Sequence, residues 1–155
     1  MVCFHGGGYS AASANLAMYN GGNLAAKHDV VVVTVNHRLN VFGYLYLAEL
    51  GGEKYAHSSN VGMLDTIAAL EWVRDIANFC GDPNNVTIFG QSGGGGKVST
   101  LMGMPGAKGL FHRVIAMSGS AVRSTPADRA TKSAEEFLGK MGLKANQVDQ
   151  LQKLP

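Results

Sequence analysis

Residues 86–94 read Val-Thr-Ile-Phe-Gly-Gln-Ser-Gly-Gly, and this stretch decides how the rest of the chain is interpreted. Its first four residues are apolar or β-branched, which is typical of a buried strand. Glycines at 90 and 94 flank Ser92 in the pattern G-x-S-x-G. A sharp strand-to-helix turn needs small residues at those two positions, and it holds the serine in a strained conformation at the top of a sheet. Ser92, in a predicted nucleophile elbow over 90–94, is therefore a candidate nucleophile.

A second glycine loop lies near the start of the chain, where residues 2–8 read Val-Cys-Phe-His-Gly-Gly-Gly. Acyl transfer passes through a tetrahedral oxyanion that needs backbone N–H donors, and glycine lets the main chain approach such a group closely. We therefore interpret residues 5–10 as a candidate oxyanion loop. Either loop alone is also compatible with a tight turn in an α/β protein, but the two together favour acyl transfer.

The rest of the chain alternates between strand and helix patterns. The expected elements are helices over 22–27, 61–79, 93 to about 102, 127–141 (with Gly142 as its C-terminal cap) and 146–154, and strands ending at Phe4 and over 30–35, 86–89 and 114–117. The 30–35 run is continuously β-branched, which indicates a strand buried on both faces. The alternation predicts an α/β fold with a mostly parallel sheet and flanking helices. Trp72 and the methionines at 102, 104, 117 and 141 are expected in the core.

The composition and charge of the chain indicate which kinds of partner it binds. Of 155 residues, 46% are hydrophobic and 15% charged, with 13 Lys+Arg against 11 Asp+Glu. No apolar run is long enough to span a membrane, and no basic block indicates nucleic acid, so we expect a small-molecule partner. The opening residues 1–8 have no basic segment and do not form a signal peptide, but they resemble the middle of a strand. We therefore expect that residues are missing upstream and that the sheet is incomplete.

Cofactor and metal motifs fail in this sequence. Cys3 and Cys80 lie in apolar contexts without a CxxC pair, so we expect buried free thiols rather than a metal site. Gly96-Lys97 ends a glycine run, but Val98 replaces the Ser or Thr that a phosphate-binding loop requires and Gln91 replaces its first glycine. A dinucleotide-binding GxGxxG is absent as well. We predict no cofactor and no metal.

Several motifs together resemble the type-B carboxylesterase and cholinesterase family of the α/β-hydrolase fold. They are His5-Gly-Gly-Gly-Tyr9, Asn36-His-Arg-Leu-Asn-Val-Phe-Gly-Tyr-Leu45, Asn60-Val-Gly-Met-Leu-Asp65, Trp72-Val73, Gly81-Asp-Pro83, Val86-Thr-Ile-Phe-Gly-Gln-Ser-Gly-Gly94, Gly109-Leu-Phe111 and Ser118-Gly119. The resemblance implies that residues 1–155 form part of an α/β-hydrolase catalytic domain. It also implies that Ser92 is the nucleophile of an esterase that acts through an acyl-enzyme, with Gly7, Gly8 and Gly93 as oxyanion-hole donors.

The sequence departs from this family in three places. Gln91 and Gly93 stand where the family often has Glu and Ala, and His37 replaces an aromatic residue. The acid and histidine of the family's triad lie beyond Pro155, so the chain resembles an amino-terminal part of the enzyme. Among its own histidines, only His37 follows a strand at the catalytic edge, and we weigh it as a surrogate base against an ordinary structural histidine. The resemblance implies that Asp65 is a structural carboxylate that ties down Arg38 or a loop, an interpretation that we favour over acid catalysis.

Two functional hypotheses remain open. The first is a serine carboxylic-ester hydrolase for small esters, in which the 155-residue chain alone is weakly active or inactive because the base is missing. The second is a non-catalytic binding or interaction module, or an inactive fragment, of the same fold family. An open sheet edge also favours self-association, or association with a segment that completes the enzyme.

Overall fold

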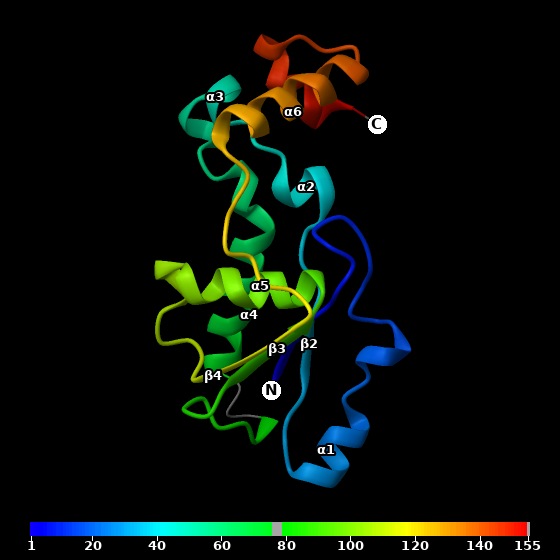
Figure 1. Cartoon of the computed structure of the whole chain (residues 1–155), viewed down its shortest axis with the longest axis vertical. Coiled ribbons are helices and arrows are strands. Elements are labelled where there is room, and N and C mark those ends of the chain that lie inside the picture. Colours follow the sequence, from blue (N-terminus) through cyan, green and yellow to red (C-terminus); the bar gives the residue numbers. More distant parts are fainter. Residues whose placement is uncertain (76–78, 155) are drawn as a thin grey trace.

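A four-stranded parallel sheet forms the centre of the computed structural model, which describes residues 1–75 and 79–154 (Figure 1). Its strands are β1 (Val2–Phe4), β2 (Val33–Val35), β3 (Thr87–Gln91) and β4 (Arg113–Met117). Their order across the sheet is β2-β1-β3-β4, and each neighbouring pair is parallel. The predicted α/β class with a parallel sheet and flanking helices is confirmed.

Short helices and 3₁₀ turns connect these strands. In chain order they are η1 (Ala17–Tyr19), α1 (Gly22–His28), α2 (Asn40–Tyr44), α3 (Ala48–Gly51), η2 (Glu53–Tyr55), η3 (Ser58–Asn60), α4 (Val61–Arg74), α5 (Gly93–Gly103), η5 (Pro105–Ala107), α6 (Ala127–Lys140) and η6 (Ala145–Lys153). The segment expected as a helix over 146–154 is 3₁₀ rather than α. Gly142 has φ +73°, as its predicted capping role requires. No helix among the described residues is long and apolar enough to cross a lipid bilayer.

The main core lies where α4 and α5 pack against the sheet. Its fully buried members include Phe4 and Ile88 from the strands, Leu70 from α4 and Val98 from α5. Burying each of these side chains contributes roughly 1.5–3 kcal/mol. The core therefore fixes α5, and with it the turn between β3 and α5, relative to the strands.

A second, smaller apolar cluster lies away from the sheet, where α6 and η6 pack near α3 (Figure 1). Leu47, Ala134, Leu138 and Val148 form its buried centre. The Nζ atom of Lys54 and the hydroxyl of Tyr55 both reach Oδ1 of Asp149, each at 2.6 Å. These contacts join the carboxyl-terminal residues to the segment before α4.

The predicted burial was wrong for several residues of the two edge strands, β2 and β4. Only Val33–Val35 of the 30–35 run forms a strand, and Val31 and Val32 are half-buried, because β2 is an edge strand. The 114–117 segment forms β4 at the other edge, where the Ile115 side chain is 45% exposed. Met117, which we expected in the core, is exposed on the same strand.

Other side chains predicted to be in the core or buried are exposed as well. Trp72 is 53% exposed, because it lies two positions after Leu70 and so falls off the buried stripe of α4. Met102 is 64% exposed next to the buried Leu101, and Met141, just beyond α6, is exposed too. Cys80 is exposed in a turn with φ +61°, whereas Cys3 is buried as expected. The predicted helix over 61–79 ends at Arg74, and residues 76–78 lie outside the described part of the chain.

Candidate active site

The register of β1 against β3 brings the two glycine loops to the same edge of the sheet. Phe4 pairs with Gly90, so both strands end side by side. In a parallel sheet this carboxyl edge is where ligands bind. The loop after β1 and the turn after β3 are therefore neighbours, as the sequence predicts.

Ser92 lies at the turn between β3 and α5, with φ +55° and ψ −120°. Its N–H donates to the carbonyl of Met117 at 2.8 Å, and its own carbonyl accepts from the N–H of Gly96 at 3.0 Å. A Cβ on Gly94 would lie 2.0 Å from the carbonyl oxygen of Phe4, so only glycine allows this approach. The residue itself is exposed. The backbone thus holds Ser92 in a strained conformation above the sheet edge.

The loop over residues 5–10 lies directly against this turn. A Cβ on Gly93 would lie 2.3 Å from the carbonyl oxygen of Gly8, which shows how closely the two backbones pack. Gly7 and Gly8 have φ values of +83° and +66°. The N–H of Gly6 donates to the hydroxyl of Tyr19 at 2.8 Å. Within the described residues, the N–H groups of Gly7 and Gly8 have no acceptor. Gly93 begins α5, where the first N–H groups of a helix also lack intrahelical partners.

The ring of His5, the first residue of this loop, stacks on the ring of His37, which follows β2. The rings of His5 and His37 are parallel, with centroids 4.7 Å apart. His5 Nδ1 is 2.8 Å from the carbonyl oxygen of Gly6, so this nitrogen is the donor, and His5 braces the loop. Burial and the charge of Lys97 lower the pKa of His37 to about 4. Burial also lowers the pKa of His5. Both rings are therefore neutral at pH 7.

The hypothesis that His37 serves as a surrogate base gains no support from this arrangement. His37 is buried against His5, and its Nδ1 lies 3.2 Å from the carbonyl oxygen of Arg38. In residues 1–75 and 79–154, no side chain is hydrogen-bonded to the hydroxyl of Ser92. His112 accepts from the N–H of Val86, at the amino ends of the strands, which is the edge opposite Ser92. His28 is the last residue of α1.

Asp65 binds Arg38, as the sequence predicts. The backbone N–H of Arg38 donates to Oδ2 of Asp65 at 2.9 Å, and its guanidinium contacts both carboxylate oxygens. This guanidinium holds the pKa of Asp65 below its usual value. The pair joins the segment after β2 to α4, so Asp65 has a structural contact rather than a place beside Ser92.

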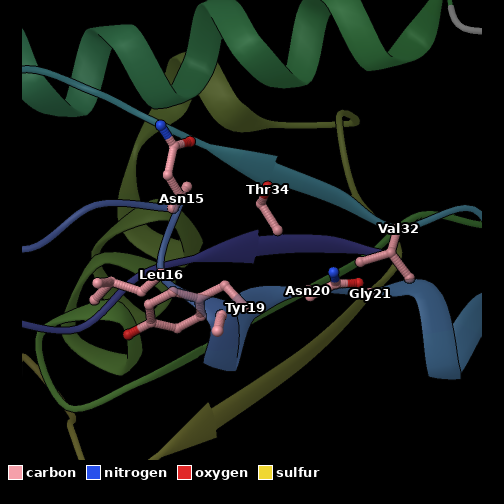
Figure 2. Close-up of a pocket in the computed structure, with 9 residues that line it drawn as sticks. Asn15, Leu16, Tyr19, Asn20, Gly21, Val32 and Thr34 are labelled. Atoms are coloured by element: carbon pink, nitrogen blue, oxygen red, sulfur yellow. The ribbon is translucent and has the colours of Figure 1, made fainter.

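A cavity of about 310 Å³ lies beside β2, and its lining includes Asn15, Leu16, Tyr19 and Thr34, which are labelled in Figure 2. Ser92 and the glycines at 7, 8 and 93 do not line it. Tyr19 connects it to the candidate site, because its hydroxyl accepts a hydrogen bond from the N–H of Gly6. The predicted site is therefore an exposed edge of the sheet and not this cavity.

The sequence analysis gave no role in the candidate site to three residues that lie near it, Tyr19, Ser118 and Gly119. Gly119 follows β4, and a Cβ there would lie 2.0 Å from the carbonyl oxygen of Ser92. Ser118 just before it has φ +51°. Both belong to a motif shared with the resembled family, which was the available signal. Tyr19 has no such signal, because its hydrogen bond to Gly6 depends on how the intervening residues fold back.

Comparison with known proteins gives the evolutionary context of this geometry. The model of the "Carboxylesterase family" matches residues 1–154. The chain belongs to the carboxylesterase family. It is 43% identical to para-nitrobenzyl esterase of Bacillus subtilis (strain 168), over 97% of this chain and 30% of that protein. It is 37% identical to acetylcholinesterase 4 of Caenorhabditis briggsae, over 96% of this chain and 24% of that protein.

Solved structures agree with this assignment. The crystal structure of a Geobacillus stearothermophilus carboxylesterase superposes with a TM-score of 0.93 at 43% identity. The match covers 99% of this chain and 33% of that chain. The carboxylesterase fold is thus shared over nearly the whole sequence described here, while the chain spans about a third of the length of such relatives.

Proposed function

We propose that Ser92 is the nucleophile of a serine carboxylic-ester hydrolase and that the N–H groups of Gly7, Gly8 and Gly93 bind the oxyanion. One observation carries the proposal: the strained Ser92 directly precedes α5, at a point where Gly93 packs against Gly8. This packing brings unpartnered backbone donors of the loop and of the helix N-terminus to the vicinity of one exposed hydroxyl. The esterases among the relatives support the same chemistry.

The proposed reaction transfers the acyl group twice, first from the alcohol to Ser92 and then from Ser92 to water. The Oγ atom of Ser92 attacks the ester carbonyl carbon and loses its proton to a general base, while the carbonyl oxygen becomes an oxyanion. Collapse of this intermediate expels the alcohol, which takes up the proton, and leaves an acyl-enzyme. Water then attacks the acyl-enzyme in the same manner and releases the carboxylic acid. Gln91 adds no charge next to Ser92, so we propose uncharged small esters as substrates.

The general base is the part of this scheme that the described residues do not supply. No described histidine is hydrogen-bonded to Ser92, and the pKa of His37, at about 4, makes it a weak base. We therefore propose that the base comes from outside these 155 residues. Without it, the hydroxyl of Ser92 remains a weak nucleophile, so we propose that the chain alone turns over esters slowly.

Hydrolysis of p-nitrophenyl acetate by the purified 155-residue chain tests the proposal. We expect slow turnover that disappears in Ser92→Ala and is unchanged in His37→Ala. Turnover that is unaffected by Ser92→Ala would contradict the role of Ser92. Ordinary esterase rates that are lost in His37→Ala would instead show that the base lies within the chain. A chain that binds esters without any Ser92-dependent turnover would favour the non-catalytic binding module.

A further inference from the structure

Lys97 is a fully buried cation in α5 that the proposed mechanism does not use. Its exposed fraction is 0%, and burial lowers its pKa to about 8. The ion pairs among the described residues join Arg38 to Asp65 and Lys54 to Asp149, so no carboxylate compensates Lys97. An ammonium group buried without a carboxylate is costly unless other groups stabilise it. Its remaining contacts therefore show what holds it there.

Lys97 makes two contacts with residues on either side of the glycines in the loop over residues 5–10. The Nζ atom of Lys97 donates to the carbonyl oxygen of His5 at 3.1 Å. The same atom lies 5.5 Å from the centre of the Tyr9 ring, within the range of a cation–π interaction. His5 and Tyr9 directly flank the three glycines. Lys97 thus connects both sides of the glycine segment to the helix that begins just after Ser92.

The glycines themselves have no side chains by which they are anchored. Among the described residues, the other hydrogen bonds that join this segment to more distant residues run from Gly6 N–H to Tyr19 and from Asn40 N–H to the carbonyl of Tyr9, at 2.7 Å for the latter. Neither of these partners belongs to α5. Lys97 is therefore the side chain of α5 whose hydrogen bond, among the described residues, joins this helix to the loop.

We propose that Lys97 is a positioning residue. It holds the oxyanion loop over residues 5–10 against α5, so that the glycines of the loop stay next to Ser92. The catalytic consequence rests on the proposed function, whereas the mechanical role does not. Methionine at position 97 would fill similar space but would provide neither the hydrogen-bond donor nor the charge. Three amides report on the loop, because Gly6, Ala11 and Asn40 donate to Tyr19, Gly7 and Tyr9.

Hydrogen exchange at these three amides, resolved by NMR, tests the proposal in Lys97→Met. Val98→Ala is the matched control, because Val98 is the next residue of α5, equally buried, but belongs to the main core. We expect exchange at the three amides to rise about tenfold or more in Lys97→Met, and to rise less in Val98→Ala at equal global stability. Unchanged exchange in Lys97→Met, or an equal rise in both variants, would overturn the proposal.

A titration of the wild-type chain keeps the proposal testable if Lys97→Met does not fold. Protection of the three amides, corrected for intrinsic exchange, is expected to fall as the pH passes about 8, because a neutral amine donates more weakly and loses the cation–π contact. His5 and His37 are already neutral there, and burial raises the pKa of Cys3 above its usual value. The Met1 amino group, whose pKa burial lowers, contacts the Val31 carbonyl instead. A flat profile would overturn the proposal.

Labelling of Ser92 by a fluorophosphonate separates this inference from the proposed function. If the proposed function holds, we expect Lys97→Met to slow labelling by about tenfold or more, since small misplacements of catalytic groups have large effects on rate. If the wild-type chain is labelled on a residue other than Ser92, the proposed function fails, while the exchange measurements still decide the role of Lys97. Labelling at the wild-type rate in Lys97→Met, together with increased exchange, would overturn the catalytic consequence.

Discussion

Replacing Gly7 by alanine changes the proposed oxyanion loop by one methyl group. Gly7 has φ +83°, and a Cβ there would lie 2.4 Å from the carbonyl oxygen of Ala11 and 2.8 Å from the Cβ of Ala12. Ordinary contact begins at 3.4 Å, so the loop must give way by about 1 Å at the Ala11 carbonyl. The carbonyl is backbone, so no flexible side chain can relieve the clash.

The expected loss follows from this displacement. A misplacement of about 1 Å can cost about 10²-fold in rate, and loss of one oxyanion donor costs about 10²- to 10³-fold. We therefore expect Gly7→Ala to slow the reaction of Ser92 by about 10²- to 10³-fold. The positive φ by itself costs an alanine roughly 1–2 kcal/mol of stability, so global unfolding must be measured separately.

Gly109→Ala provides the matched control for backbone strain. Gly109 has φ +80°, and a Cβ there would meet nothing within 4 Å. It should lose similar stability in a thermal melt but react with a fluorophosphonate at the wild-type rate. The assay is the rate of Ser92 labelling, followed by intact mass at a temperature where all three proteins are folded. A folded Gly7→Ala that is labelled as fast as the wild-type chain would refute the oxyanion role of this loop.

Two further predictions concern side chains outside the loop. Asp65→Asn should lower the free energy of unfolding by about 1 kcal/mol at pH 7, since the pair with Arg38 is partly exposed. Because Arg38 lowers the pKa of Asp65 in the folded state, this contribution is present above the unfolded pKa of about 4 and is lost as the pH falls through the folded value. Thermal melts of both proteins should therefore converge once the pH is below the folded pKa of Asp65, and a difference that persists in fully protonating acid would contradict the assignment. Titration with a thiol reagent should modify Cys80 rapidly in the native chain, and Cys3 only on unfolding, because burial shields Cys3 and raises its pKa. Equal reactivity of both thiols would show that β1 is not packed as described.

Local patterns were sufficient to predict the elements that position Ser92. The Val-Thr-Ile-Phe run followed by spaced glycines specifies a strand, a strained turn and a helix, and the structure has all three. The shared edge of the two loops followed from parallel pairing, because the carboxyl ends of parallel strands lie at one edge of a sheet. The contact of Asp65 was expected from the family resemblance, which left Arg38 or a loop as its partner.

Burial at the edges was not predictable from sequence patterns. Val31 and Ile115 have the β-branched character of buried strands, but their exposure depends on which strands lie at the ends of the sheet. Trp72 lies near enough to the apolar stripe of α4 to be counted as core, although a rotation of two residues carries it to the surface. The contact of Lys97 with His5 joins residues 92 positions apart and leaves no local pattern.

Covalent labelling of the native chain by a fluorophosphonate tests the central claim most directly. The Ser92 oxygen should displace fluoride from phosphorus, which adds a single phosphonyl group that peptide mapping locates on Ser92. Ser92→Ala and the heat-unfolded chain should remain unlabelled under the same conditions, because the hydroxyl is reactive only when the turn and the loop over residues 5–10 are folded together. An adduct on a residue other than Ser92 of the folded chain, or equal labelling of Ser92→Ala, would contradict the assignment of Ser92 as the nucleophile.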